Sequence, residues 1–225
     1  MGAYNTLKVI HILSIATWLG VDLGVFACSS IARSRTLSAE ARGQFLSLLG
    51  RLDLGPRVSL IATIPLGLSL AHLSWGVAPG FGAVTGWIVA LLCVGWALLV
   101  VRQHHGLGRL ARPFMIVDTT VRVGLVVALA ATSIASFAHG PDGGPVPALW
   151  LRWKVLLFAG MIACGLWIRF AMRDAGPLFG AMLKADATEV DFEPVDRMIR
   201  SLYPPVFAIW LGIIVCILLA TTKPF

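Results

Sequence analysis

The chain has 225 residues, of which 58% are hydrophobic and 13% are charged, and its formal net charge at pH 7 is +7. Ordinary soluble domains carry about a quarter charged residues, so this composition excludes a typical soluble enzyme and indicates a membrane protein. A basic protein can also bind nucleic acid, but here the Lys and Arg residues gather in loops between apolar stretches. We therefore expect a lipid bilayer, and no nucleic acid, as the partner.

Six apolar stretches follow one another, each long enough to cross about 30 Å of hydrocarbon. The predicted spans are residues 7–31, 56–75, 83–102, 114–138, 149–171 and 203–222. They use nearly the whole chain, so we expect an all-α polytopic bundle of about six transmembrane helices in a single domain, 1–225. The longest connection, around 173–202, is expected to form short interfacial helices broken at Gly176-Pro177 and Pro194.

The basic residues alternate between connections. The first and third connections hold Arg33, Arg35, Arg42, Arg51, Arg102, Arg109 and Arg112, and the fifth holds further Lys and Arg among acidic residues. The second and fourth connections, 74–82 and 139–147, contain no Lys or Arg. The positive-inside rule then places the odd connections in the cytoplasm and both termini in the periplasm of a bacterium. The expected location is the bacterial cytoplasmic (inner) membrane.

The first span has one polar face. His11, Trp18 and Asp22 fall within a few tens of degrees of one another on a helix, so this face is expected to point inward. A histidine in such a position serves as a hydrogen-bonding residue, a proton relay, or an axial ligand to haem or copper. The sequence of this helix alone does not choose between these roles.

A layer of polar residues is predicted near the periplasmic side. Its members are His11, His72, His139, Arg152 and Lys154. Three histidines at one depth beside two cations favour a cofactor site, because haem takes axial imidazoles from separate helices and cations near its propionates. Arg152 and Lys154 lie about 200° apart on their helix, so only one of them is expected to face the interior.

A second polar layer is predicted near the cytoplasmic side. It contains Asp22, Arg57, Asp118 and Arg122, and the last two have the i,i+4 spacing of an ion pair. Such a layer carries protons or forms a structural ion-pair network, and both interpretations stay open. The four cysteines form no CxxC or CxxCH motif, which disfavours a zinc ribbon and c-type haem.

Four segments of the chain resemble a known membrane family. Lys8, His11, Trp18 and Gly20 match a K-x-x-H segment followed by W-x-G, and the other matching segments are 56–70, 150–156, and 197–204 with the last helix. In this order they resemble the HemJ-type protoporphyrinogen oxidases and the related copper-resistance D (CopD) family. The resemblance implies a helical membrane protein with b-type haem, in which His11 corresponds to the first-helix histidine and Lys154 to the functional lysine.

The chain also departs from that family. Two predicted helices, 83–102 and 114–138, stand where the shorter HemJ-type chains have none, and the expected tyrosine-histidine pair is replaced by residues 167–170. These differences disfavour protoporphyrinogen oxidation itself and favour a divergent member with another electron donor.

The predicted function is therefore that of a haem-b-binding membrane oxidoreductase, passing electrons from a lipophilic reductant of quinol or porphyrinogen type to another acceptor. His11 is expected to be one axial ligand and His72 or His139 the other, with Arg152 or Lys154 at the propionates and Trp18 beside the cofactor. Catalytic roles are expected for Lys154 and, in proton transfer, for Asp22, Arg57, Asp118 and Arg122. The alternatives are a copper or small-solute permease that uses the histidines as metal ligands, and a cofactor-free subunit of a larger membrane complex. Partners then include a quinone or porphyrin, a second copy of the chain, or another membrane subunit.

Overall fold

The computed structural model describes residues 2–75, 83–105, 111–140, 144–184 and 192–223. In chain order the elements are α1 (Ala3–Ala32), α2 (Ala39–Leu52), α3 (Leu54–Trp75), α4 (Ala83–His104), α5 (Ala111–Ala138), α6 (Leu149–Ala171), the short 3₁₀ helix η2 (Met172–Asp174), α7 (Ala175–Lys184) and α8 (Glu193–Thr222). Every regular element in these ranges is helical, which confirms the predicted all-α class.

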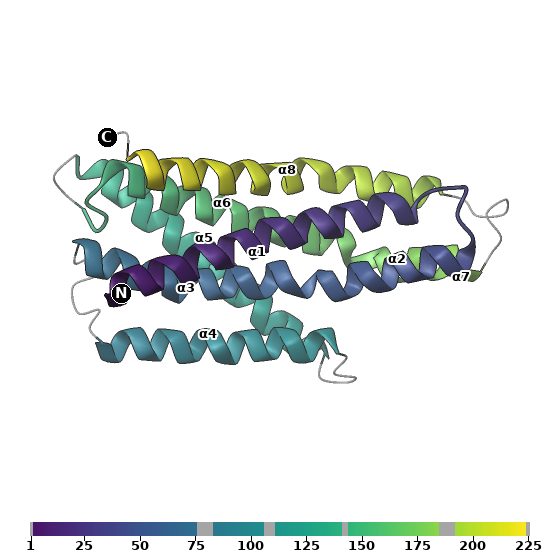
Figure 1. The fold of residues 1–225 in the computed structure, drawn as a ribbon, viewed down its shortest axis with the longest axis horizontal. Coiled ribbons are helices and arrows are strands. Elements are labelled where there is room, and N and C mark those ends of the chain that lie inside the picture. Colours follow the sequence, from purple (N-terminus) through teal and green to yellow (C-terminus); the bar gives the residue numbers. More distant parts are fainter. Residues whose placement is uncertain (1, 76–82, 106–110, 141–143, 185–191, 224–225) are drawn as a thin grey trace.

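Six of the helices are long and apolar enough to cross a membrane: α1, α3, α4, α5, α6 and α8. Figure 1 shows them side by side along the long axis of the molecule, with α2 and α7 at one end and both termini at the other. An even number of crossings places both termini on one side, as predicted. The chain is thus a multi-pass membrane protein by helix length and composition.

Two connections between the predicted spans contain further helices: α2 in the first, and α7 in the fifth, where short helices were expected. In the first, Ser38 begins α2 by accepting a hydrogen bond from the backbone nitrogen of Ala41 at 3.2 Å, as an N-cap does. Asp53, which separates α2 from α3, itself has right-handed helical backbone angles, so the two helices are nearly continuous. The predicted span 56–75 agrees with α3 to within two residues, and helical structure continues back through α2 to Ala39.

The prolines of the last connection begin helices instead of breaking them. Pro194 lies in the first turn of α8, and Gly176-Pro177 lies in the first turn of α7. Backbone N–H groups in the first turn have no intrahelical acceptor, so proline costs little there. The expected short helix of this connection is α7, and the helix boundaries lie next to the predicted residues; α8 begins ten residues before the predicted start of the last span, at 203.

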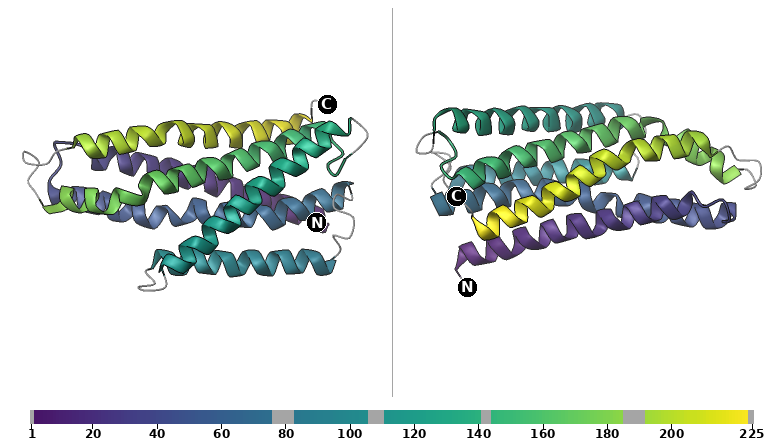
Figure 2. Two further views of the ribbon diagram at one scale, coloured as in Figure 1. Left: turned by 180° about the vertical axis from the view of Figure 1, so that it is seen from behind. Right: turned by 90° about the horizontal axis from the view of Figure 1, so that it is seen from above.

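The closest helix pairs are α1 with α3, α6 with α8, and α5 with α6. The main core lies between these pairs and contains Trp18, Leu60, Ile61, Trp96, Val100, Met161, Ile162, Ile209, Ile213 and Cys216. Figure 2 shows that α5 crosses the bundle obliquely, while α4 lies on the outside. The exposed side chains of α4 are largely apolar, as a lipid-facing helix requires.

A second, smaller core holds α2, α7 and the start of α8 together at the far end. Phe192, Val195 and Ile199 are buried there. Arg42 of α2 is completely buried, donates from Nε to the carbonyl oxygen of Leu37 at 3.2 Å, and lies 5.3 Å from the centre of the Phe192 ring. This contact ties the end of the bundle to the start of α8.

Candidate functional site: a histidine seam and a buried charge cluster

His11 lies in a polar seam between α1 and α3. One turn along α1, Ser14 donates from its hydroxyl to the carbonyl oxygen of Ser59 at 3.1 Å, and lies 3.4 Å from the hydroxyl of Thr63. At Gly67 an added Cβ would stand 3.6 Å from Cε1 of His11, so the imidazole packs directly against the α3 backbone. Small residues allow this close approach of two membrane helices.

The His11 ring is only 8% exposed, and its Nδ1 atom has no hydrogen-bond partner among the described residues. Leaving a buried polar atom without a partner costs about 1–3 kcal/mol. Lys154 of α6 interacts electrostatically with this imidazole, and Tyr4 interacts with Lys154. The seam therefore combines a buried imidazole that has an unused nitrogen with a cation from another helix.

Two residues of the predicted inward face of α1, His11 and Trp18, are buried, which confirms the prediction for them. Trp18, seven residues after His11, is 4% exposed and packs edge-on against Phe158 of α6, with ring centroids 6.4 Å apart. Asp22 is half-buried, and its Oδ2 accepts a hydrogen bond from Nε1 of Trp210 at 2.7 Å.

The other two histidines lie at helix ends, outside this seam. His72 is half-buried in the last turn of α3. His139 is exposed just after α5, with Nδ1 2.7 Å from the carbonyl oxygen of Ala135. No group of three or more His, Cys, Asp or Glu side chains able to hold a metal ion occurs in the described residues. The three histidines were predicted to share a depth, but within the described residues the packing does not gather them into one metal site.

Arg152 is directed at the connection between α5 and α6. It is 1% exposed and donates to the carbonyl oxygens of Val146 at 2.7 Å, Gly140 at 2.7 Å and Pro147 at 3.2 Å. These bonds satisfy backbone oxygens that the turn leaves without helical partners. Of the two cations predicted near the cofactor, Lys154 is the one whose charge acts on the His11 imidazole.

The predicted Asp118–Arg122 pair is part of a larger buried cluster. Asp118 accepts from Nε1 of Trp96 at 2.6 Å and from Nε of Arg122 at 3.2 Å, and it also pairs with Arg169 of α6. Arg169 in turn donates to Oε1 of Gln103 at 3.3 Å. The cluster thus joins α4, α5 and α6 through one carboxylate and two guanidinium groups.

Sequence reasoning missed Arg169 and Trp96. The available signal was an arginine inside the predicted span 149–171, which normally needs a partner within the bundle. Arg57, which was predicted to join the same layer, forms its own i,i+4 ion pair with Asp53 at the junction of α2 and α3.

No family model, curated protein or solved structure matches this chain. The resemblance to the HemJ and CopD families therefore rests on the residues quoted above, and the proposals below rest on the geometry of this chain.

Proposed function

We propose that the protein is a haem-b-binding redox protein of the bacterial inner membrane, with its termini in the periplasm. It transfers electrons from a lipophilic reductant, of quinol or porphyrinogen type, to another acceptor. The observation that carries the proposal is the buried His11 imidazole, which has a ring nitrogen without a partner in the described structure. A metal ion satisfies such a nitrogen without the cost of a second buried polar group.

The residue types around His11 are those that a haem site requires. His11 would be the axial ligand on α1, and Lys154 would supply a positive charge for a propionate. The second ligand would be His139 or His72, of which His72 lies on the helix that packs against His11. His139 is exposed just after α5, whereas His72 is half-buried within α3, which makes His139 the weaker candidate. When bound, the haem would supply a one-electron centre within the bilayer.

The other charged residues of the chain would have separate roles in structural pairing, proton transfer and ligand binding. Arg57 and Arg122 are each paired with an aspartate four residues before them in the chain. Such ion pairs are a structural reason for an arginine to occur within a membrane bundle. The proton role predicted for the cytoplasmic layer is then best assigned to Asp22, whose carboxylate is hydrogen-bonded to Trp210. Half-buried Lys154 would hold the acidic end of a cofactor or substrate.

The test is the absorption spectrum of the purified protein with a pyridine haemochrome assay, after expression with ample haem. We expect a Soret band and b-type haem in the wild type. His11→Ala should still insert, because the helix becomes more apolar, but it should lose haem or shift the spectrum. His105→Ala changes an exposed histidine after α4 and is the matched control, expected to leave the spectrum unchanged.

A colourless wild type would contradict the haem assignment, and so would a His11→Ala protein with unaltered spectrum and haem content. In either case the haem proposal would be replaced by one of the two alternatives, a cofactor-free subunit of a larger complex or a permease. A histidine-based metal permease is less well supported, because the described residues hold no cluster of three or more metal-ligating side chains.

A further inference from the structure

Asp22 is an acid inside an otherwise apolar helix. Between Lys8 and Arg33 it is the one residue with a formal charge at neutral pH. It lies ten residues before Ala32, the end of α1, which corresponds to about 15 Å along the helix axis. A charged side chain at such a depth is costly, and it normally pairs with another charge or marks a route for protons or ions.

The neighbouring cations are already paired with other acids. Arg33 donates from Nη1 to Oδ1 of Asp196 at 2.9 Å, and Arg57 pairs with Asp53. Asp53 interacts electrostatically with Asp22 as a like charge. No ion pair in the described parts of the chain includes Asp22. Among the described residues its carboxylate therefore has a tryptophan donor but no ion-pair partner.

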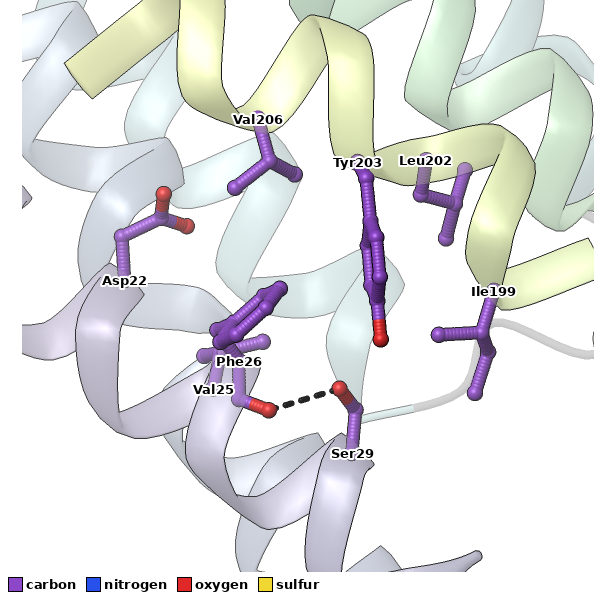
Figure 3. A pocket seen from close by; sticks show the side chains of 8 residues that line it. All are labelled: Asp22, Val25, Phe26, Ser29, Ile199, Leu202, Tyr203 and Val206. Carbon is purple, nitrogen blue, oxygen red and sulfur yellow. Dashed lines mark hydrogen bonds between the residues drawn. The ribbon is translucent and has the colours of Figure 1, made fainter. Parts of the chain in front are cut away.

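A cleft of about 60 Å³ adjoins this carboxylate (Figure 3). It lies between α1 and α8 and is lined by Asp22, Val25, Phe26, Ser29, Ile199, Leu202, Tyr203 and Val206. Asp22 lies at one end of the space, and the hydroxyls of Ser29 and Tyr203 lie at the other. A cavity needs about 10–15 Å³ of such space to hold a water, so this cleft is large enough for at least one water molecule.

The far end of the cleft is joined to charged groups. The Tyr203 hydroxyl accepts a hydrogen bond from Nη2 of Arg33 at 2.9 Å, and Arg33 also holds Asp196. Arg33 directly follows α1, and Asp196 lies in the first turn of α8. The end of α1 and the start of α8 lie at the end of the bundle that carries α2 and α7 (Figure 1). A chain of waters in the cleft would therefore have polar partners at both ends, as buried water requires.

We propose that the α1–α8 cleft is a hydrated proton path that ends at Asp22 and opens toward the α2 and α7 end of the bundle. A proton from water joins the Asp22 carboxylate to give a neutral carboxylic acid, and the reverse step returns it. No electron is transferred in this step, so it proceeds in the protein without any cofactor. This site lies on α1 and α8, separate from the His11 seam between α1 and α3, and extends beyond the haem proposal.

The experiment follows Asp22 by infrared difference spectroscopy on haem-free protein in lipid vesicles. The C=O stretch of a protonated carboxylic acid should appear on lowering the pH and should be absent in Asp22→Asn, which keeps an acceptor for Trp210. Ser29→Leu places an apolar side chain in the cleft. It should slow the hydrogen–deuterium shift of this band about tenfold, because the intervening water is displaced.

Ser201→Leu is the matched control. Ser201 makes the same bond as Ser29, to the carbonyl oxygen three residues earlier (2.6 Å to Met198, against 2.7 Å to Phe26 for Ser29), but it is exposed outside the cleft. In Ser201→Leu the hydrogen–deuterium shift of the Asp22 band should be as fast as in the wild type. If Ser29→Leu fails to fold, Val25→Phe fills the same space.

Two results would overturn the proposal: no carboxylic acid band that depends on Asp22, or exchange that is as fast in the filled-cleft variant as in the wild type. Neither depends on the haem spectrum. A colourless protein with the expected band would overturn the haem assignment and leave the proton path standing.

Discussion

Removing the Asp118 carboxylate should destabilise the bundle more than removing either of its arginines. Asp118 is 2% exposed and is the acid to which both Arg122 and Arg169 are paired, so the three residues together carry a charge of +1. Asp118→Asn raises that charge to +2 and leaves two guanidinium groups without a countercharge. Arg169→Gln leaves a neutral pair of Asp118 with Arg122, and Trp96 keeps its acceptor.

The expected magnitudes follow from this charge count. Breaking a buried pair by removing one partner costs about 3–5 kcal/mol, and here one acid serves two bases, so Asp118→Asn belongs at the upper end of this range. Losing hydrogen bonds to a charged group costs about 1.5–3 kcal/mol, which is the expectation for Arg169→Gln. Neutralising Asp118 and Arg122 together still leaves Arg169 alone, so that double variant should stay destabilised until Arg169→Gln is added.

The assay is reversible unfolding in mixed micelles, followed by tryptophan fluorescence and far-ultraviolet circular dichroism, with Arg112→Gln on the exposed start of α5 as the control. Equal unfolding free energies for Asp118→Asn and Arg169→Gln would refute the reasoning. So would a double variant of Asp118 and Arg122 that is as stable as the wild type.

Two further outcomes are expected. An added Cβ at Gly212 would stand 2.9 Å from Cγ and Sδ of Met161, so Gly212→Ala should cost about 1–3 kcal/mol through overpacking of α6 against α8. An added Cβ at Gly165 would have no neighbouring atom within 4 Å, so Gly165→Ala should be neutral or slightly stabilising in the same unfolding assay. Equal effects of the two substitutions on the unfolding free energy would contradict this packing of α6 against α8. A topology reporter fused after Thr222 should give a periplasmic signal, because the connections at that end lack Lys and Arg. A cytoplasmic signal would reverse the predicted orientation.

The sequence by itself determined the membrane-spanning helices. The predicted span 149–171 coincides with α6, and the predicted span 83–102 differs from α4 by two residues at one end. A run of about 20 apolar residues must form a helix in lipid whatever its neighbours are, because each backbone polar group has to be satisfied within the segment. The inward face of α1 was likewise a local property, since residues seven apart on one helix share a side.

Only the tertiary structure decided which polar residues meet. His11, His72 and His139 share a predicted depth, but depth does not fix the rotation of a helix or the neighbour that it faces. His11 is turned onto α3 at Gly67, whereas His139 is exposed. Asp118 and Arg122 were paired correctly from their spacing, but Arg169, 51 residues along the chain from Asp118, joins them only because α5 packs against α6. Contacts within one helix repeat with its period and can be read from the chain, while contacts between helices depend on how their side chains pack across the whole bundle.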